Sequence, residues 1–230
     1  MYMTTRAQKD TSRGSLPEIV RNDQGLYEGD LVGYFRVIFF NAKNLNHAYH
    51  NFRHMFHVTW LCYQACDFYR KILSPREMRN LLIAAMFHDF DHADGAVGDE
   101  HNIAVAVSGL TTYVLPEDKK HLEEIISLIR ATEYPYAVPS EELPLLAQII
   151  RDADMGQGFS DAWIQQIVFG LAAEQGKRPI EILRSEEEFC RNVRFHTEWG
   201  RSMFSREKID EKAAEAKELL GILEEADGNH

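Results

Sequence analysis

The chain has 230 residues, of which 45% are hydrophobic and 27% charged, and 25 basic against 36 acidic side chains give a formal charge of −11 at pH 7. This length and composition are those of a globular protein with a buried core. The acidity excludes a binder of polymeric nucleic acid, which needs a basic face to neutralise phosphates. The acidity does not exclude a small phosphorylated substrate, which needs only a local positive site such as a metal ion.

The apolar pattern excludes membrane-spanning and secreted classes. The longest apolar run, residues 81–87, is far shorter than the roughly 20 residues that cross a bilayer, and the N-terminal segment lacks the apolar core of a secretory signal. The three cysteines are an odd number and predict no disulfide framework. Cys62 and Cys66 lie four positions apart in an apolar stretch, as buried thiols do. We therefore expect a cytoplasmic protein without membrane contact.

Taken in chain order, the elements predict one all-α domain. Residues 1–25 are polar, and we expect them to form a tail or arm ahead of a domain over residues 26–230. Apolar residues at helical spacing predict helices over residues 30–43, 50–73, 75–90, 99–113, 116–133, 140–153, 160–174, 186–203 and 206–226. Ser74-Pro75 and the Ser-x-x-Glu pattern from Ser185 to Glu188 mark helix starts. No segment predicts a strand, so the fold class is a single helical bundle.

Histidines and carboxylates gather in the middle of the chain. Seven of the ten histidines lie in one stretch: His47, His50, His54, His57, His88, His92 and His101. His50 and His54 are four apart and share a helix face. His88-Asp89 ends a helix so apolar that it must be buried, and Asp154 ends another apolar helix. Buried charge is costly unless it is paired or coordinates a metal, so these residues predict a metal site between core helices.

These residues carry a resemblance to a known family. The chain resembles the HD-domain superfamily of metal-dependent phosphohydrolases, named for its His…His-Asp…Asp ligand set, over about residues 30–225. The Tyr-His-Asn-x-x-His run at 49–54 and the His-Asp-x-Asp-His run at 88–92 are similar to cyclic-nucleotide phosphodiesterases. Asp99-Glu100, which opens a helix, is similar to a pattern of small bacterial HD phosphohydrolases.

The resemblance implies a role for each matching residue. It implies one metal ion ligated by His54, His88, Asp89 and Asp154. It further implies a second ion reached by Asp89 and Glu100, a general acid at His50, and a site-lining role for His92. Nitrogen and oxygen donors suit one or two divalent ions among Zn, Mn, Fe, Mg, Ni and Co.

Basic residues near these motifs are candidates for binding a substrate phosphate. Arg53 adjoins His54 in the sequence, although its side chain points about 100° away on a helix. Arg191, Arg194 and Arg201 are further candidates.

The expected function is hydrolysis of a small phosphate ester, a nucleotide or related metabolite, by a metal-activated hydroxide. A homodimer is compatible with the sequence. The alternatives are a cyclic-nucleotide or dinucleotide phosphodiesterase, an HD signalling module that binds metal without turnover, and a di-iron HD oxygenase. Cyclic-nucleotide phosphodiesterases select purines with a glutamine well beyond the last metal-binding Asp, whereas the last glutamine here is Gln175. The run at 131–134, Ala-Thr-Glu-Tyr, lacks the further histidine of many two-metal HD proteins, which counts against the oxygenase.

Overall fold

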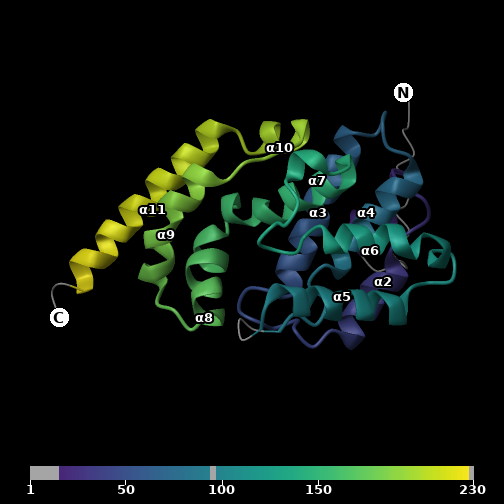
Figure 1. Ribbon diagram of the computed structural model, residues 1–230, viewed down its shortest axis with the longest axis horizontal. Coiled ribbons are helices and arrows are strands. Elements are labelled where there is room, and N and C mark those ends of the chain that lie inside the picture. Colours follow the sequence, from purple (N-terminus) through teal and green to yellow (C-terminus); the bar gives the residue numbers. More distant parts are fainter. Residues whose placement is uncertain (1–15, 94–96, 228–230) are drawn as a thin grey trace, which may run out of the picture.

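The structure is a computed structural model that describes residues 16–93 and 97–227. Every regular element in these ranges is a helix, which confirms the predicted all-α class (Figure 1). No helix within them is both long and apolar enough to cross a membrane. Cys62, Cys66 and Cys190 are buried thiols.

The last residues of the predicted N-terminal arm pack into the core. Residues 1–15 of the expected arm lie outside the described residues. Beyond them, helix α1 (Glu18–Arg21) places the Ile19 and Val20 side chains in the core at 1% exposure each. Burial of this apolar pair therefore makes the end of the predicted arm part of the domain.

The central helices form one packed group. Its members are α2 (Val32–Asn41), α3 (Phe52–Phe68), α4 (Pro75–Phe87), α5 (Asp99–Tyr113), η1 (Lys119–His121), α6 (Leu122–Arg130), η2 (Ser140–Glu142) and α7 (Leu145–Met155). Helix α4 runs through the middle, and every residue from 78 to 87 is buried. A capping box between Ser74 and Glu77 closes the N-terminal end of α4. Asn51 is the N-cap of α3, and its side chain accepts hydrogen bonds from two backbone N–H groups.

Most of the C-terminal helices form a second group at the other end of the molecule, whereas α10 (Glu198–Met203) packs against α3 and α7 (Figure 1). After η3 (Gly156–Phe159) come the π-helix η4 (Ile164–Leu171), α8 (Ala172–Glu174), α9 (Pro179–Asn192), α10 (Glu198–Met203) and α11 (Arg206–Asp227). Trp163, Val168, Leu183 and Ala216 belong to a small core of their own, separate from the main one. The seam between the two cores holds the site described below.

Two predicted helix boundaries are wrong. The predicted helix 186–203 is two helices, because Pro179 and Glu181 start α9 earlier and the chain is extended around residues 193–197. Ser185 is therefore not a cap but lies inside α9, where its hydroxyl donates to the Ile182 carbonyl. The predicted helix 140–153 is interrupted at Pro144, which precedes the first residue of α7.

Buried Asp152 of α7 fixes the segment that connects α9 to α10. Its carboxylate accepts hydrogen bonds from the backbone N–H groups of His196 and Thr197, and from the Thr197 hydroxyl. In this way the carboxylate anchors the residues that precede α10 to the last turns of α7. Gly200 is required beside it, since a Cβ there would lie 2.2 Å from Asp152 Oδ2.

We expect Gly109→Ala to destabilise the fold. Gly109 packs α5 against the Phe90 ring, and a Cβ would lie 2.4 Å from that ring's Cδ1. Because Phe90 is 3% exposed and cannot move aside freely, we expect a loss of about 1–3 kcal/mol in the free energy of unfolding, measured by urea titration. Gly221→Ala in α11 is the control, since nothing lies within 4 Å of its added Cβ. It is expected to be neutral or stabilising by up to about 1 kcal/mol. Equal effects of the two substitutions would contradict the packing argument.

Candidate metal centre and catalytic pocket

Four polar side chains from the ends of three helices meet in the interior. His54 lies in the first turn of α3, His88-Asp89 follows α4, and Asp154 lies in the last turn of α7. His54 Nε2 is 3.1 Å from Asp154 Oδ1 and 3.2 Å from Asp89 Oδ2. His88 Nε2 is 3.2 Å from the same Asp89 oxygen and 3.3 Å from His54 Nε2. The structure thus brings together the four residues expected to bind metal.

The chemistry of these atoms suits a divalent cation. His88 Nδ1 lies 2.8 Å from the Ala85 carbonyl oxygen and donates its proton there, so its Nε2 lone pair faces the cluster. Asp89 Oδ2 is buried, and the polar atoms near it are the Nε2 atoms of His54 and His88. Ligand atoms about 2.0–2.2 Å from one ion stand roughly 3 Å apart, which is the spacing seen here. His54, His88 and Asp89 therefore have the donor types and the proximity of a metal-binding group.

Protons occupy the cluster in the absence of a cation. Burial lowers the pKa of His54, but its hydrogen bonds with Asp154 and Asp89 outweigh burial and raise the pKa to about 9. For Asp154, burial raises the pKa, but the hydrogen bonds from His54 and His88 outweigh it, so the pKa falls well below its usual range. The two carboxylates are thus ionised at neutral pH. A divalent cation would replace protons held by the imidazoles, because a ligating histidine must be neutral.

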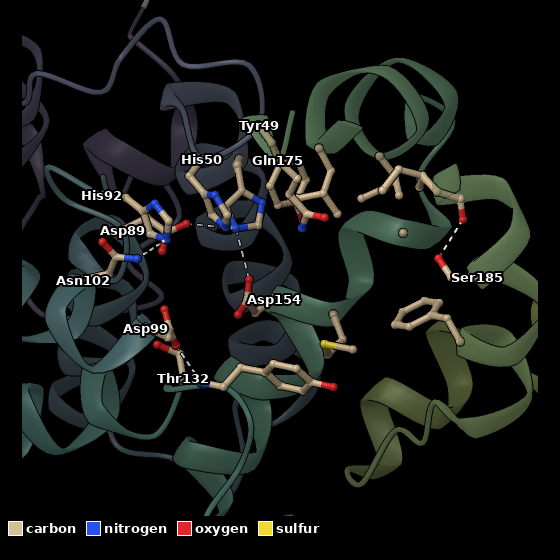
Figure 2. Close-up of a pocket in the computed structure, with 18 of the residues that line it drawn as sticks. Tyr49, His50, Asp89, His92, Asp99, Asn102, Thr132, Asp154, Gln175 and Ser185 are labelled. Carbon is tan, nitrogen blue, oxygen red and sulfur yellow. Dashed lines mark hydrogen bonds and ion pairs between the residues drawn. The ribbon is translucent and has the colours of Figure 1, made fainter. Parts of the chain in front are cut away.

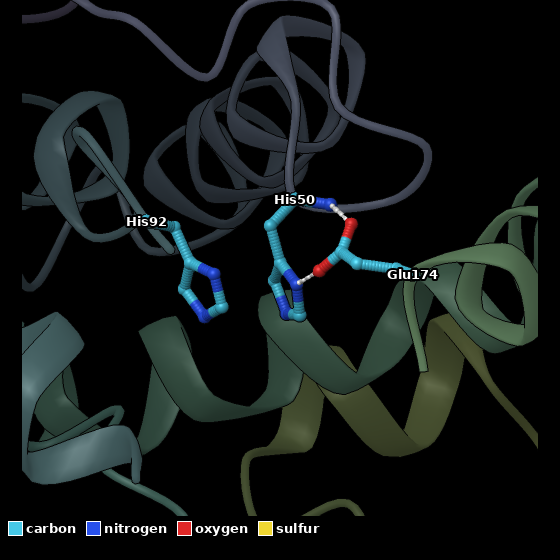
Figure 3. Close-up of side chains that lie close together, drawn as sticks. All are labelled: His50, His92 and Glu174. Carbon is cyan, nitrogen blue, oxygen red and sulfur yellow. Dashed lines mark hydrogen bonds and ion pairs between the residues drawn. The ribbon is translucent and has the colours of Figure 1, made fainter. Parts of the chain in front are cut away.

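His50 stands next to this cluster and is held by Glu174 (Figure 3). Glu174 Oε1 contacts His50 Nδ1, while Oε2 accepts from the backbone N–H groups of Tyr49 at 2.8 Å and of His50 at 3.0 Å. Burial raises the pKa of Glu174, but the hydrogen bond from His50 outweighs it and lowers the pKa to about 2. A carboxylate at Nδ1 orients the ring and leaves Nε2 as the atom that exchanges a proton in the pocket.

His92 supports His50 as a neutral ring. The two imidazoles stack with centroids 3.7 Å apart and planes at 15°. Asn102 Nδ2 donates to His92 Nε2 at 2.9 Å, and burial lowers the pKa of His92 to about 4. His50, His92 and Glu174 also have the proximity of a metal-binding group. However, Glu174 is already engaged by the ring and backbone of residue 50, and this favours a positioning role for the group.

A cavity of about 490 Å³ lies beside these groups, which is the size of a small-molecule site (Figure 2). Its wall includes His50, Asp89 and Asp154 at one end and Ser185 of α9 at the other. Asp99 also lines it and accepts from the Tyr134 backbone N–H at 2.6 Å. The cavity therefore joins the candidate metal centre to the second core.

Some predicted site residues lie elsewhere. Glu100 is exposed and is not part of the cavity wall, whereas its neighbour Asp99 is. Arg53 is likewise exposed and outside the wall that His54 lines. Neighbours on a helix point about 100° apart, so only one of each pair faces the site. The structure therefore does not bring Glu100 or Arg53 to the cavity. The other arginine candidates are also exposed and outside the wall: Arg191, Arg194 and Arg201.

Sequence reasoning missed three polar groups of the site. Asp99 was visible beside Glu100, and the rotation of α5 decides between them. Glu174 gives no local signal, because its partner His50 lies 124 positions away. Glu186 lies in a charged run of α9 that looks like a solvated face, yet it is buried and lines the cavity.

Comparisons with known proteins agree with this geometry. Residues 49–97 match the family described as 3'5'-cyclic nucleotide phosphodiesterase. The fold is similar to the crystal structure of the phosphodiesterase domain of rhodopsin phosphodiesterase from Salpingoeca rosetta. The match has a TM-score of 0.62 at 15% identity and covers 84% of this chain and 82% of that one. A comparison with curated protein sequences finds no match.

These findings confirm the resemblance predicted from the motifs. The matched segment holds His50, His54 and the His88-Asp89 pair, and the helices that carry them have the fold of a phosphodiesterase domain. The matched family and the similar solved structure are both phosphodiesterases, which hydrolyse phosphate ester bonds.

We expect Asp89→Asn to abolish metal retention. The amide keeps the shape but removes the charge that faces both histidines. Affinity should fall more than about 100-fold, since even changing a residue that only orients a ligand costs roughly 10- to 100-fold. Metal content after dialysis against Mn²⁺ or Zn²⁺, measured by mass spectrometry, tests this. Asp67→Asn, exposed on the same helix as His54, should retain the wild-type amount. Full retention by Asp89→Asn would overturn the ligand assignment.

Proposed function

We propose that the protein is a metal-dependent phosphodiesterase that hydrolyses 3',5'-cyclic nucleotides. The observation that carries the proposal is the juxtaposition of the His50–Glu174 pair with the four-residue donor cluster at one end of a nucleotide-sized cavity. A phosphodiester needs both a site for its phosphate and a proton donor for its leaving alkoxide, and the pocket offers the two side by side.

This reading replaces the main expectation from the sequence, a phosphatase of small phosphate esters, with its stated alternative. The family match spans both histidine motifs and is to cyclic nucleotide phosphodiesterases. The position of the last glutamine, Gln175, had disfavoured a cyclic-nucleotide phosphodiesterase. Gln175 lines the cavity but is exposed, and its side-chain oxygen accepts from Lys177 at 2.8 Å. Its position therefore bears little on the substrate, and the wall of α9 is the better place to look for base recognition.

Within the proposal, His54, His88, Asp89 and Asp154 would hold one divalent cation. Such a cation supplies Lewis-acid polarisation of a phosphoryl oxygen and lowers the pKa of a water molecule towards neutrality. The ionised carboxylates balance its charge, and the Ala85 carbonyl fixes the His88 ring through Nδ1. One or two divalent ions remain compatible with the donors present, since Asp99 lies in the same wall as Asp89.

His50 would supply the proton that the leaving group needs. Its Nε2–H gives the proton to the departing sugar oxygen as the P–O bond breaks, and a water oxygen becomes the fourth oxygen of the product phosphomonoester. The imidazole then regains a proton from solvent. Glu174 keeps the ring oriented throughout, and the stacked His92 ring restricts its rotation.

We expect the protein with Mn²⁺, Mg²⁺, Zn²⁺, Fe²⁺, Co²⁺ or Ni²⁺ to release 5'-nucleotides from 3',5'-cyclic nucleotides faster than it releases phosphate from phosphomonoesters. Product analysis by chromatography measures both reactions in one assay. Faster release of phosphate from 5'-nucleotides would favour the monoester phosphatase instead. Metal binding without any turnover on either class would favour a signalling module.

We expect His50→Gln to show a leaving-group effect. Hydrolysis of a cyclic nucleotide should fall about 100-fold or more, since its alkoxide needs a proton. A p-nitrophenyl phosphodiester should lose less than about tenfold, because its phenolate leaves without one. Steady-state rates on the two substrates measure the difference. His101→Gln is the control, being exposed on α5. An equal loss on both substrates would rule out a general-acid role for His50.

A further inference from the structure

The wall of the cavity opposite the candidate metal centre is one face of α9. Ile182, Ser185, Glu186 and Phe189 all line the cavity and follow the helical spacing i, i+3, i+4, i+7. Figure 2 shows Ser185 across the cavity from Asp89 and His50. A molecule whose phosphate lies at the donor cluster would therefore extend its other end towards α9.

Glu186 is an anomalous residue in this wall. Glu186 is only 4% exposed. The one polar partner described for its carboxylate is the weak donor Cys190 Sγ, which lies 3.9 Å from Oε1. Two buried carboxylates outside the cavity wall, Asp118 and Asp152, are by contrast well satisfied. Asp118 accepts from Arg79, Arg76 and Tyr34, for example. A buried carboxylate with so little compensation is costly, and such cost is most often found at functional sites.

The charged groups around Glu186 do not compensate it either. Lys212 of α11 is the cation that acts on it, but the Lys212 ammonium forms its ion pair with Glu215 at 2.5 Å. On the cavity side, the Tyr49 hydroxyl is kept neutral by burial and by the surrounding carboxylates, including Glu186. Burial is the main cause that raises the pKa of Glu186 to about 7, with the Cys190 contact and Lys212 opposing it.

Apolar side chains make up much of the rest of this end of the cavity. Ile167 and Leu171 of the π-helix line it together with Ile182 and Phe189. The Phe189 ring is half-buried and stacks on Phe159 on its other side, with centroids 6.0 Å apart. A flat aromatic base fits between such walls, and Glu186 is then the hydrogen-bonding group at its edge.

We propose that Glu186 selects the base of the substrate by accepting hydrogen bonds from two neighbouring N–H donors, so that a guanine nucleotide is preferred to an adenine nucleotide. Guanine presents N1–H and N2–H side by side, which matches the two oxygens of a carboxylate. Adenine presents one donor and one acceptor on that edge and leaves a carboxylate oxygen facing a lone pair. The inference deepens the proposed phosphodiesterase activity and rests on it for the orientation of the substrate.

The preference depends on pH because the ionised and the protonated carboxyl of Glu186 form different hydrogen bonds with the base. The ionised form accepts twice and suits guanine. The protonated form accepts once and donates once, which suits adenine. The ratio of kcat/KM for cyclic GMP to that for cyclic AMP therefore rises as pH increases through about 7. Titrations of the phosphate-binding end affect both substrates alike and cancel in this ratio.

The test compares wild type, Glu186→Gln and the control Glu188→Gln, which is exposed on the same helix. We expect wild type to favour cyclic GMP by about tenfold or more above the pKa of Glu186. Glu186→Gln, whose amide both donates and accepts, should lose that preference and its pH dependence. Glu188→Gln should keep both. A wild-type ratio within about twofold of unity at every pH, or a preference unchanged in Glu186→Gln, would overturn the inference.

Two further measurements separate this inference from the proposed function. Calorimetric binding of 5'-GMP and 5'-AMP needs no turnover, so a GMP preference lost in Glu186→Gln would support base selection even in a protein that hydrolyses nothing. Hydrolysis of bis(p-nitrophenyl) phosphate, which has no base, reports the phosphodiesterase step alone. Activity on this substrate combined with no preference between guanine and adenine nucleotides would overturn the inference and leave the proposed function intact. If Glu186→Gln fails to fold, the wild-type pH profile and nucleotide binding still decide.

Discussion

The burial of α4 is the constraint on which the site depends. This helix is enclosed along its length by α3, α5, α6 and α7. His88 and Asp89 directly follow its last residue and therefore lie in the interior. Ionisable groups placed there require compensation, and the ends of α3 and α7 supply His54 and Asp154 at about 3 Å. The same packing that stabilises the helical core thus assembles an oxygen and nitrogen donor set suited to a divalent cation.

The cavity is a seam between two cores, and its two ends differ in chemistry. The end formed by the main core concentrates charge: the donor cluster, the His50–Glu174 pair and Asp99. The end formed by η4 and α9 is mostly apolar, and Ser185 and Glu186 are the polar residues that α9 contributes to it. A substrate with a charged reacting group and a flat heterocycle is complementary to this division, because each part meets a wall of matching polarity.

Two carboxylates hold distant segments of the chain together around the pocket, and the first of them acts across the seam. Glu174, from the C-terminal group, holds His50 beside the main core, and Asp152 of the main core anchors the segment ahead of α10. Buried carboxylates that accept several hydrogen bonds are rigid connectors. The position of His50 relative to the donor cluster therefore depends on the packing of the C-terminal helices, although none of the four donors lies in them.

The amino-acid sequence by itself determined the helical class and most helices, because apolar periodicity is a local property that survives without coordinates. It also indicated the four residues of the donor cluster, since His88-Asp89 and Asp154 end helices too apolar to lie at the surface. Only the tertiary structure decided that Asp99 rather than Glu100 faces the cavity and that Arg53 stays outside its wall, because helix rotation is set by packing. It also decided that Glu174 meets His50 and that Glu186 is buried, since both result from contacts between helices distant in the chain.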